Sequence, residues 1–190
     1  GHVLAHVCIP KVAGAAAARA PIDALEALAP SMPVHLLVET HGALREVEQL
    51  ARIRSVECLE FGLMDFVSAH QGAIPGSAMR SPGQFEHALV RRAKVELAAA
   101  ALGAGVVPSH NVTVDHRRPT QAGEDARRAF LELGYLRMWS IHPAQIRPIL
   151  DAFRPDDADV ARAAERWLSW TESMPARCPS TRGRCRWQAQ

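Results

Sequence analysis

The sequence predicts an α/β protein whose parallel sheet is of the (β/α)-barrel type. Short apolar runs alternate with amphipathic helical stretches from residue 4 to about residue 171. Repeated strand-helix units of this kind join parallel strands through right-handed crossovers. The pattern yields five strands, and five strands cannot close an eight-stranded barrel.

The first half of the chain predicts three strands, at about 4–9, 34–38 and 56–61. An Ala-rich helical segment follows the first strand, and Pro21 can open the helical turn that begins at Ile22, because proline suits the start of a helix. After the second strand, the apolar residues of segment 43–53 fall on one helical face and the charged residues on the other.

The second half predicts two further strands, near 105–107 and at 136–141. Four helices are expected, over about 82–102, 120–133, 144–153 and 156–171. Gly103 and Gly134 follow the first two of these helices, as a helix stop signal should. Asp156 or Asp157 is expected to cap the last helix.

The composition is that of a folded soluble domain, expected over residues 1–173. The 190 residues are 48% hydrophobic and 22% charged, which is enough to build a core. The net charge of +2 favours neither nucleic acid nor a membrane surface as a partner. No apolar run approaches the roughly 20 residues that a spanning helix needs.

The four cysteines predict a reduced, cytoplasmic protein. Cys8, Cys58, Cys178 and Cys185 are widely scattered and show no paired metal-ligand spacing. Segment 1–10 has no charged head followed by an apolar stretch, so it lacks the pattern of a signal peptide.

Two carboxylates stand where apolar runs stop. Glu39 follows Leu36-Leu37-Val38, and Asp65 ends the stretch Phe61-Gly62-Leu63-Met64-Asp65. A short buried strand delivers the next side chain to the rim of a parallel sheet, where two hard oxygen donors can share one Mg²⁺ ion. The alternative is two ordinary surface acids.

Four motifs in order resemble the citrate lyase beta-chain and malyl-CoA lyase superfamily. They are Pro10-Lys11-Val12, Val38-Glu39-Thr40, Phe61-Gly62-Leu63-Met64-Asp65 and Ser140-Ile141-His142-Pro143-Ala144-Gln145. The resemblance covers about residues 3–170. It implies that the visible strands are strands four to eight of a TIM-type barrel, and that the chain is either a fragment or a degenerate version of the fold.

The resemblance also implies a Mg²⁺-dependent cleavage of a 3-hydroxyacyl-CoA ester, such as citryl-, malyl- or citramalyl-CoA, to an acyl-CoA and a 2-oxo acid. Glu39 and Asp65 occupy the family's Mg²⁺ positions. Mg²⁺ held by two carboxylates keeps open positions for a substrate hydroxyl and carboxylate. A homo-oligomer is expected, because a parallel sheet that stops after five strands leaves apolar strand edges without partners.

Two further residues are candidates for the chemistry. Lys11 follows Pro10 at the end of the first strand, where its ammonium could attract a thioester enolate or a CoA phosphate, or simply be solvated. His142 is expected at the barrel mouth, where its imidazole could bond the substrate or fix the strand-to-helix turn.

His41, His70 and His110 are all expected near strand ends. A cluster of imidazoles would favour Zn²⁺ or Fe²⁺ over Mg²⁺, but no pair has a helical ligand spacing.

The tail at 174–190 has no periodic apolar pattern and is expected to be disordered. Alternatives to the lyase stay open. They are an aldolase acting on free 2-oxo acids, a thioesterase using the same metal site, and a non-catalytic fragment that associates with other chains.

Overall fold

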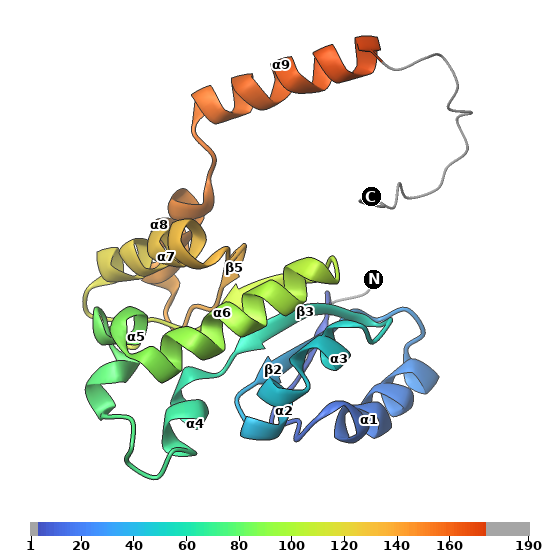
Figure 1. The fold of residues 1–190 in the computed structure, drawn as a ribbon, viewed down its shortest axis with the longest axis vertical. Helices are drawn as coiled ribbons and strands as arrows, with labels where there is room; N and C mark the ends of the chain where they lie inside the picture. The colour runs from blue at the N-terminus through green and yellow to red at the C-terminus, as the bar shows by residue number, and fades with distance from the viewer. Residues whose placement is uncertain (1–3, 174–190) are drawn as a thin grey trace. The chain divides into compact units, whose positions relative to one another are not determined.

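The computed structural model describes residues 4–173 of the chain (Figure 1). The chain divides into two units, one ending at Phe153 and the other beginning at Arg154. The first unit holds the sheet and its helices, and the second holds one described helix, α9 (Asp157–Ser173). The domain limit expected at residue 173 stays a prediction, and the tail expected to be disordered lies outside the described residues.

The first unit is built on one five-stranded parallel sheet, as the sequence predicted. Its order is β1-β2-β3-β4-β5, and every neighbouring pair is parallel. The strands are β1 (Val7–Ile9), β2 (Val34–Val38), β3 (Val56–Phe61), β4 (Val107–His110) and β5 (Arg137–Met138). The second and third strands have the predicted bounds. The first and fifth are shorter than expected, and the fourth lies a few residues later.

Helices connect successive strands, which gives the expected βαβ units. Their bounds are α1 (Ala15–Leu28), α2 (His41–Arg45), α3 (Val47–Ala51), α4 (Leu63–Ser68), the 3₁₀ turn η1 (Gly76–Met79), α5 (Gly83–Glu86), α6 (Ala88–Gly103), α7 (Pro119–Leu133) and α8 (Pro143–Phe153). Helices α7 and α8 begin and end within one residue of their predicted bounds.

Three helical predictions need correction. Pro21 lies inside α1 and does not open it, since the helix already begins at Ala15. The single helix expected over 43–53 is two helices that break at Glu46, and the helix expected over 82–102 breaks at His87. Helix α4, directly after the third strand, was not predicted from the sequence.

Two of the helix-end signals predicted from the sequence are present in the structure. Gly134 ends α7 in the left-handed region at φ 77°, which a glycine adopts without strain. The Asp156 carboxylate accepts a hydrogen bond from the Asp159 N–H at 2.6 Å, so Asp156 caps α9.

The core lies between the sheet and its helices. Ile9, Leu36 and Leu59 are register partners on β1, β2 and β3, and the two leucines are fully buried. Leu97 of α6 belongs to the same buried cluster. Helices α3 and α6 pack side by side on this face (Figure 1).

The next register row is polar, because successive strand residues point to opposite faces. Cys8, His35 and Cys58 are partners across β1, β2 and β3. These side chains therefore lie on the face opposite the leucine row. Among residues 4–173, no helix has the length and apolar character to cross a membrane.

Candidate metal centre at the carboxyl edge of the sheet

The carboxyl ends of β1, β2 and β3 bring three predicted site residues together. Lys11 follows β1, Glu39 follows β2 directly, and Asp65 lies in the first turn of α4, just after β3. Because the strands are parallel and adjacent, these ends share one edge of the sheet. The three residues line one open cavity of about 290 Å³ together with Thr40, His41 and Ala69.

Lys11 contacts both acids. Its backbone N–H donates to Glu39 Oε1 at 2.8 Å, and its Nζ lies 3.4 Å from Asp65 Oδ2. The residue has φ 53°, a left-handed conformation that is uncommon for a lysine. Strained backbone of this kind clusters at functional sites, and here it aims the Lys11 N–H at Glu39.

Glu39 is buried, with 5% of its surface exposed. Burial raises the pKa of its carboxyl, and the nearby Asp65 carboxylate raises that pKa further, against the lowering effect of the Lys11 N–H. A buried acid beside a second acid is costly when both are ionised. Two carboxylates this close, with oxygen donors only, suit a hard divalent cation such as Mg²⁺.

Gly62 makes room for Glu39. A Cβ at Gly62 would lie 2.4 Å from Glu39 Cβ and 2.5 Å from its Oε2, which real side chains do not tolerate. The Gly62 N–H donates to the Val38 carbonyl at 3.0 Å, which ties β3 to β2 at this point. The glycine of the Phe61-Gly62-Leu63 motif therefore has a steric reason to be there.

Thr40 joins the loops after β1 and β2. Its hydroxyl donates to the Val12 carbonyl at 2.8 Å and accepts from the Ala43 N–H at 3.0 Å, which caps α2. A Cβ at Gly42 would lie 1.9 Å from the Ala13 carbonyl oxygen, so only glycine allows this approach. These contacts hold Lys11 and Glu39 against each other.

His142 is not brought to this cavity in the structure. It is exposed, follows β5, and its ring lies 5.9 Å from that of His116. Its Nδ1 accepts from the Ala144 N–H at 3.2 Å, so it shapes the turn into α8. Its expected role at the substrate stays a prediction.

The three histidines expected near strand ends do not form one cluster. The His41 and His70 rings lie 4.5 Å apart beside the cavity. The His70 ring is bonded to the Phe66 carbonyl at 2.7 Å. His110 is fully buried elsewhere, among the residues of a separate network.

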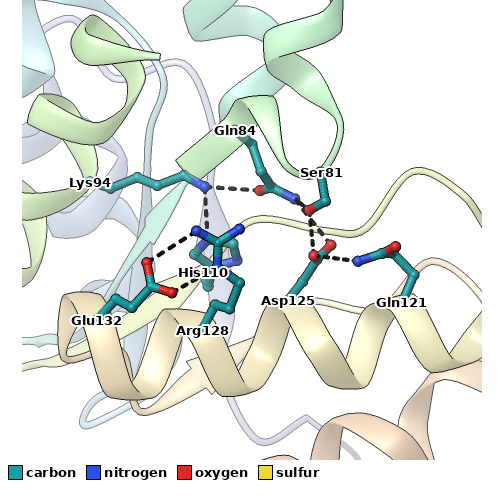
Figure 2. A network of polar contacts seen from close by, with 8 residues as sticks. All are labelled: Ser81, Gln84, Lys94, His110, Gln121, Asp125, Arg128 and Glu132. Atoms are coloured by element: carbon teal, nitrogen blue, oxygen red, sulfur yellow. Dashed lines mark hydrogen bonds and ion pairs between the residues drawn. The ribbon is translucent and has the colours of Figure 1, made fainter. Parts of the chain in front are cut away.

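That network was missed from the sequence (Figure 2). Lys94 Nζ of α6 lies 2.9 Å from Gln84 Oε1 and 2.8 Å from His110 Nε2. The Gln84 amide donates to Asp125 Oδ2 of α7 at 3.0 Å. Burial lowers the pKa of Lys94 well below its usual range, and burial together with Lys94 lowers that of His110. These residues are almost fully buried, and the network joins α5, α6, β4 and α7.

A second cluster of polar side chains was not predicted from the sequence. It lies on the face of the sheet opposite the leucine row, called the inner face below. It consists of Cys8, His35, Cys58 and Glu60, which the structure brings together from three strands. The widely spaced cysteines gave no sign of this arrangement, because it depends on strand register.

Solved structures with the same fold include a citrate lyase from Burkholderia xenovorans LB400. It is 50% identical, with a TM-score of 0.83, and the match covers 93% of this chain and 58% of that chain. Protein CitE from Mycobacterium tuberculosis, in complex with magnesium, acetoacetate and coenzyme A, is 25% identical. Its TM-score is 0.67, with 91% of this chain and 60% of that chain covered.

A curated relative is the citrate lyase subunit beta-like protein of Deinococcus radiodurans. It is 28% identical over 160 residues, which are 84% of this chain and 53% of the relative. The chain thus spans about half the length of the curated relative it matches. No family model matches the chain.

The parallel sheet, its flanking helices and the acids at its carboxyl edge define an α/β protein of the TIM-barrel class. Within that class, the curated relative and the solved structures support the citrate lyase beta and CoA-ester lyase superfamily for this chain. The resemblance read from its four motifs is therefore confirmed.

Proposed function

We propose that this chain carries the metal-binding part of a Mg²⁺-dependent carbon-carbon lyase. The substrate class is a 3-hydroxyacyl-CoA ester of the citryl-, malyl- or citramalyl-CoA kind, and the products are an acyl-CoA and a 2-oxo acid. The observation that carries the proposal is the convergence of Lys11, Glu39 and Asp65 in one cavity at the carboxyl edge of the sheet. The magnesium complex of the Mycobacterium tuberculosis relative supports it.

Glu39 and Asp65 would hold the ion. A bound Mg²⁺ would orient the substrate's hydroxyl and carboxylate oxygens and stabilise negative charge on oxygen as the carbon-carbon bond breaks. In that step the substrate hydroxyl gives its proton to water and becomes a carbonyl, while the bonding electron pair moves onto the thioester as an enolate. The enolate then takes a proton from water at carbon to give the acyl-CoA. The exposed Lys11 ammonium, 3.4 Å from Asp65, offers positive charge to this enolate.

Two adjoining cavities support a CoA ester over a free acid. One, of about 840 Å³, extends from Met64, next to Asp65, to Arg80 and Ser81. The other, of about 570 Å³, shares Arg80 and Ser81 and is also lined by Arg117 and Arg118. Guanidinium groups suit phosphate recognition. The two cavities together, called the arginine groove below, can therefore bind the phosphates of CoA.

A direct assay separates the candidate reactions. The chain, loaded with Mg²⁺, is incubated with citryl-CoA, malyl-CoA and citramalyl-CoA, and the products are identified by mass spectrometry. The proposal expects an acyl-CoA and a 2-oxo acid from at least one thioester, and loss of that activity in Asp65→Asn. A folded, Mg²⁺-loaded chain that only condenses free pyruvate with aldehydes would be an aldolase, and one that releases only free CoA would be a thioesterase.

The arginine groove has its own test. Arg117→Ala is expected to raise KM for the thioester several-fold and to leave kcat nearly unchanged, because it would remove binding far from the reacting bond. Arg52→Ala, an exposed arginine of another surface, is the matched control. An unchanged KM in Arg117→Ala would remove this groove from the CoA site.

The second candidate function is a non-catalytic subunit or fragment that associates with other chains. The observation that favours it is the open sheet, in which β1 and β5 are outer strands of the described structure. Unpaired strand edges invite pairing with another chain. Absence of every cleavage product from a folded, Mg²⁺-binding chain would favour this candidate.

A further inference from the structure

The inner face of the sheet carries a second set of metal-ligating side chains. Cys8, His35 and Cys58 occupy one register row across β1, β2 and β3, and Glu60 lies two residues beyond Cys58 on the same face. Neighbouring strands are about 4.8 Å apart, so the row places a thiol on each side of an imidazole.

The donor atoms are close to one another. His35 Nδ1 lies 2.8 Å from Glu60 Oε1, and the Cys8 thiol donates to Glu60 Oε2 at 3.1 Å. One ligand atom from each of His35, Cys58 and Glu60 lies within 4.8 Å of the others. In a tetrahedral zinc site the ligand atoms are about 3.3–3.8 Å apart, so a bound ion would draw these three atoms closer together. The Cys8 thiol lies outside this group of three and contacts Glu60, so it would have to turn toward them.

The cluster is buried and incompletely satisfied. His35 and Glu60 are each 3% exposed and Cys58 is fully buried. His35 Nε2 is buried without a hydrogen-bond partner, although the ring stacks on His6 at 3.7 Å. Because Glu60 Oε1 faces Nδ1, Nδ1 is the ring nitrogen that could share an ion with this carboxylate, and the unpartnered Nε2 shows only that the polar atoms of the cluster are not all satisfied.

A disulfide does not explain the two cysteines. Cys8 and Cys58 lie on strands separated by β2, so their Cα atoms are about 9.5 Å apart, beyond the roughly 7 Å that a disulfide spans. A thiolate nucleophile does not explain them either. Burial raises the pKa of Cys58 to about 12, and burial and Glu60 raise that of Cys8.

We propose that His35, Cys58 and Glu60, with Cys8 as the fourth ligand, bind one Zn²⁺ ion on the inner face of the sheet. Thiolate and imidazole select Zn²⁺ over Mg²⁺, in contrast to the oxygen donors Glu39 and Asp65. Binding displaces one proton from each thiol, and those protons pass to solvent. The site is separate from the carboxyl-edge centre, because Glu39 lies four residues beyond His35 along β2, about 13 Å away. It does not depend on the proposed lyase function.

Cobalt substitution tests the site directly. Co²⁺ is titrated into reduced protein carrying Cys178→Ser and Cys185→Ser, so that only Cys8 and Cys58 can contribute thiolates. We expect one thiolate-ligated Co²⁺ per chain, seen as a thiolate-to-cobalt absorption band that saturates at one equivalent of this site. Cys58→Ser is expected to abolish that band or to weaken Co²⁺ binding at least tenfold, and Cys8→Ser to reduce its intensity by about half. Asp65→Asn should leave the band unchanged.

A second measurement keeps the inference testable if a cysteine variant folds poorly. Zn²⁺ should raise the melting temperature of the Cys178→Ser, Cys185→Ser protein, because a ligand of the folded state stabilises it, and should raise that of the same protein carrying Cys8→Ser by a smaller amount. Mg²⁺ at the same concentration should not reproduce the shift in Asp65→Asn. Absence of both the thiolate band and a Zn²⁺-dependent melting shift would overturn the inference, as would a band that persists in both Cys58→Ser and Cys8→Ser.

Discussion

Glu39 is the acid of the carboxyl-edge cavity whose pKa the fold raises. The folded chain holds its proton more tightly than the unfolded chain does, because burial and Asp65 raise its pKa. Between the unfolded and folded pKa values, its contribution to stability therefore falls as pH rises, and a bound cation offsets that loss. In the proposed site, the same proton would compete with Mg²⁺ for the carboxylate.

We therefore expect Mg²⁺ affinity to fall as pH is lowered through the raised pKa of Glu39, at higher pH than the ordinary glutamate value of about 4.3 would give. Calorimetric titration between pH 5 and 7.5 measures this. Glu39→Gln should bind more weakly and lose most of the pH dependence. Parallel pH profiles in the two proteins would show that Glu39 is not the titrating ligand.

The positions of two acids of the carboxyl-edge cavity could be predicted from the sequence. Glu39 and Asp65 stand directly after apolar runs, and strand ends in a parallel sheet converge. The left-handed φ of Lys11 and the hydrogen bond from its N–H to Glu39 were not readable, because neither follows from residue type. Where His142 points depends on packing after β5, which the local sequence does not encode.

At the scale of elements, the junction of β3 and α4 depends on Gly62. We expect Gly62→Ala to destabilise the fold by about 1–3 kcal/mol, because its Cβ would clash with Glu39 and force the strands apart. Mg²⁺ affinity should fall as well, since the clash displaces Glu39. Chemical denaturation and calorimetry measure the two effects.

Gly103→Ala is the matched control, because a Cβ there would meet nothing within 4 Å and the residue ends α6. It should be neutral or slightly stabilising. If Gly62→Ala is as stable as Gly103→Ala and binds Mg²⁺ normally, the steric account of this junction is incorrect.

The buried Lys94 network should make stability depend on pH. Its lysine has a pKa well below the ordinary value of about 10.4, so the unfolded chain binds the extra proton. Stability should then rise with pH between the folded and unfolded values and fall as pH is lowered. Denaturation at pH 6, 8 and 10 should show a smaller rise in Lys94→Met than in the unmodified chain.

Lys11→Met is the control for this experiment, since Lys11 is exposed and its loss should leave the pH dependence unchanged. At pH 10, Lys94→Met should also cost about 1–3 kcal/mol, because Gln84 Oε1 and His110 Nε2 lose their partner. An equal pH dependence in both variants would mean that Lys94 is not the titrating group.

The helix breaks show where sequence patterns stop being informative. The periodicity over 43–53 is helical, but Glu46 interrupts it because its Oε2 accepts from the Ala15 N–H at 2.7 Å, at the start of α1. Such a long-range contact overrides local propensity. Pro21 fits within α1 because it is exposed and its missing N–H leaves only the exposed Ala17 carbonyl without a helical partner.

At the scale of the whole molecule, the sheet leaves two strands with one neighbour each. Around β5, Leu136, Trp139 and Ile141 are large apolar residues that remain exposed. We expect the chain to oligomerise or aggregate rather than remain a monomer, because edges and apolar surface together favour association. Light scattering with a thermal melt measures this, and a monodisperse monomer with a cooperative transition would contradict it.

The order of strands and helices followed from their alternation, and so did the parallel sheet. The cysteine-histidine cluster on the inner face and the buried Lys94 network did not follow from this alternation. Cys8 and Cys58 are fifty residues apart in sequence and meet only through the register of three strands. Lys94 and His110 meet because α6 packs on β4, and such pairings depend on tertiary packing that no sequence window contains.

Glu39 and Asp65 are proposed to form one Mg²⁺ site, and a calorimetric Mg²⁺ titration tests this most directly. It compares the unmodified chain with Asp65→Asn and with Glu57→Gln, an exposed acid paired with Arg137 away from the cavity. We expect the unmodified chain to bind one Mg²⁺ ion. Asp65→Asn should bind Mg²⁺ at least tenfold more weakly, and Glu57→Gln should bind it as the unmodified chain does. Equal binding by the unmodified chain and Asp65→Asn would contradict the proposed site.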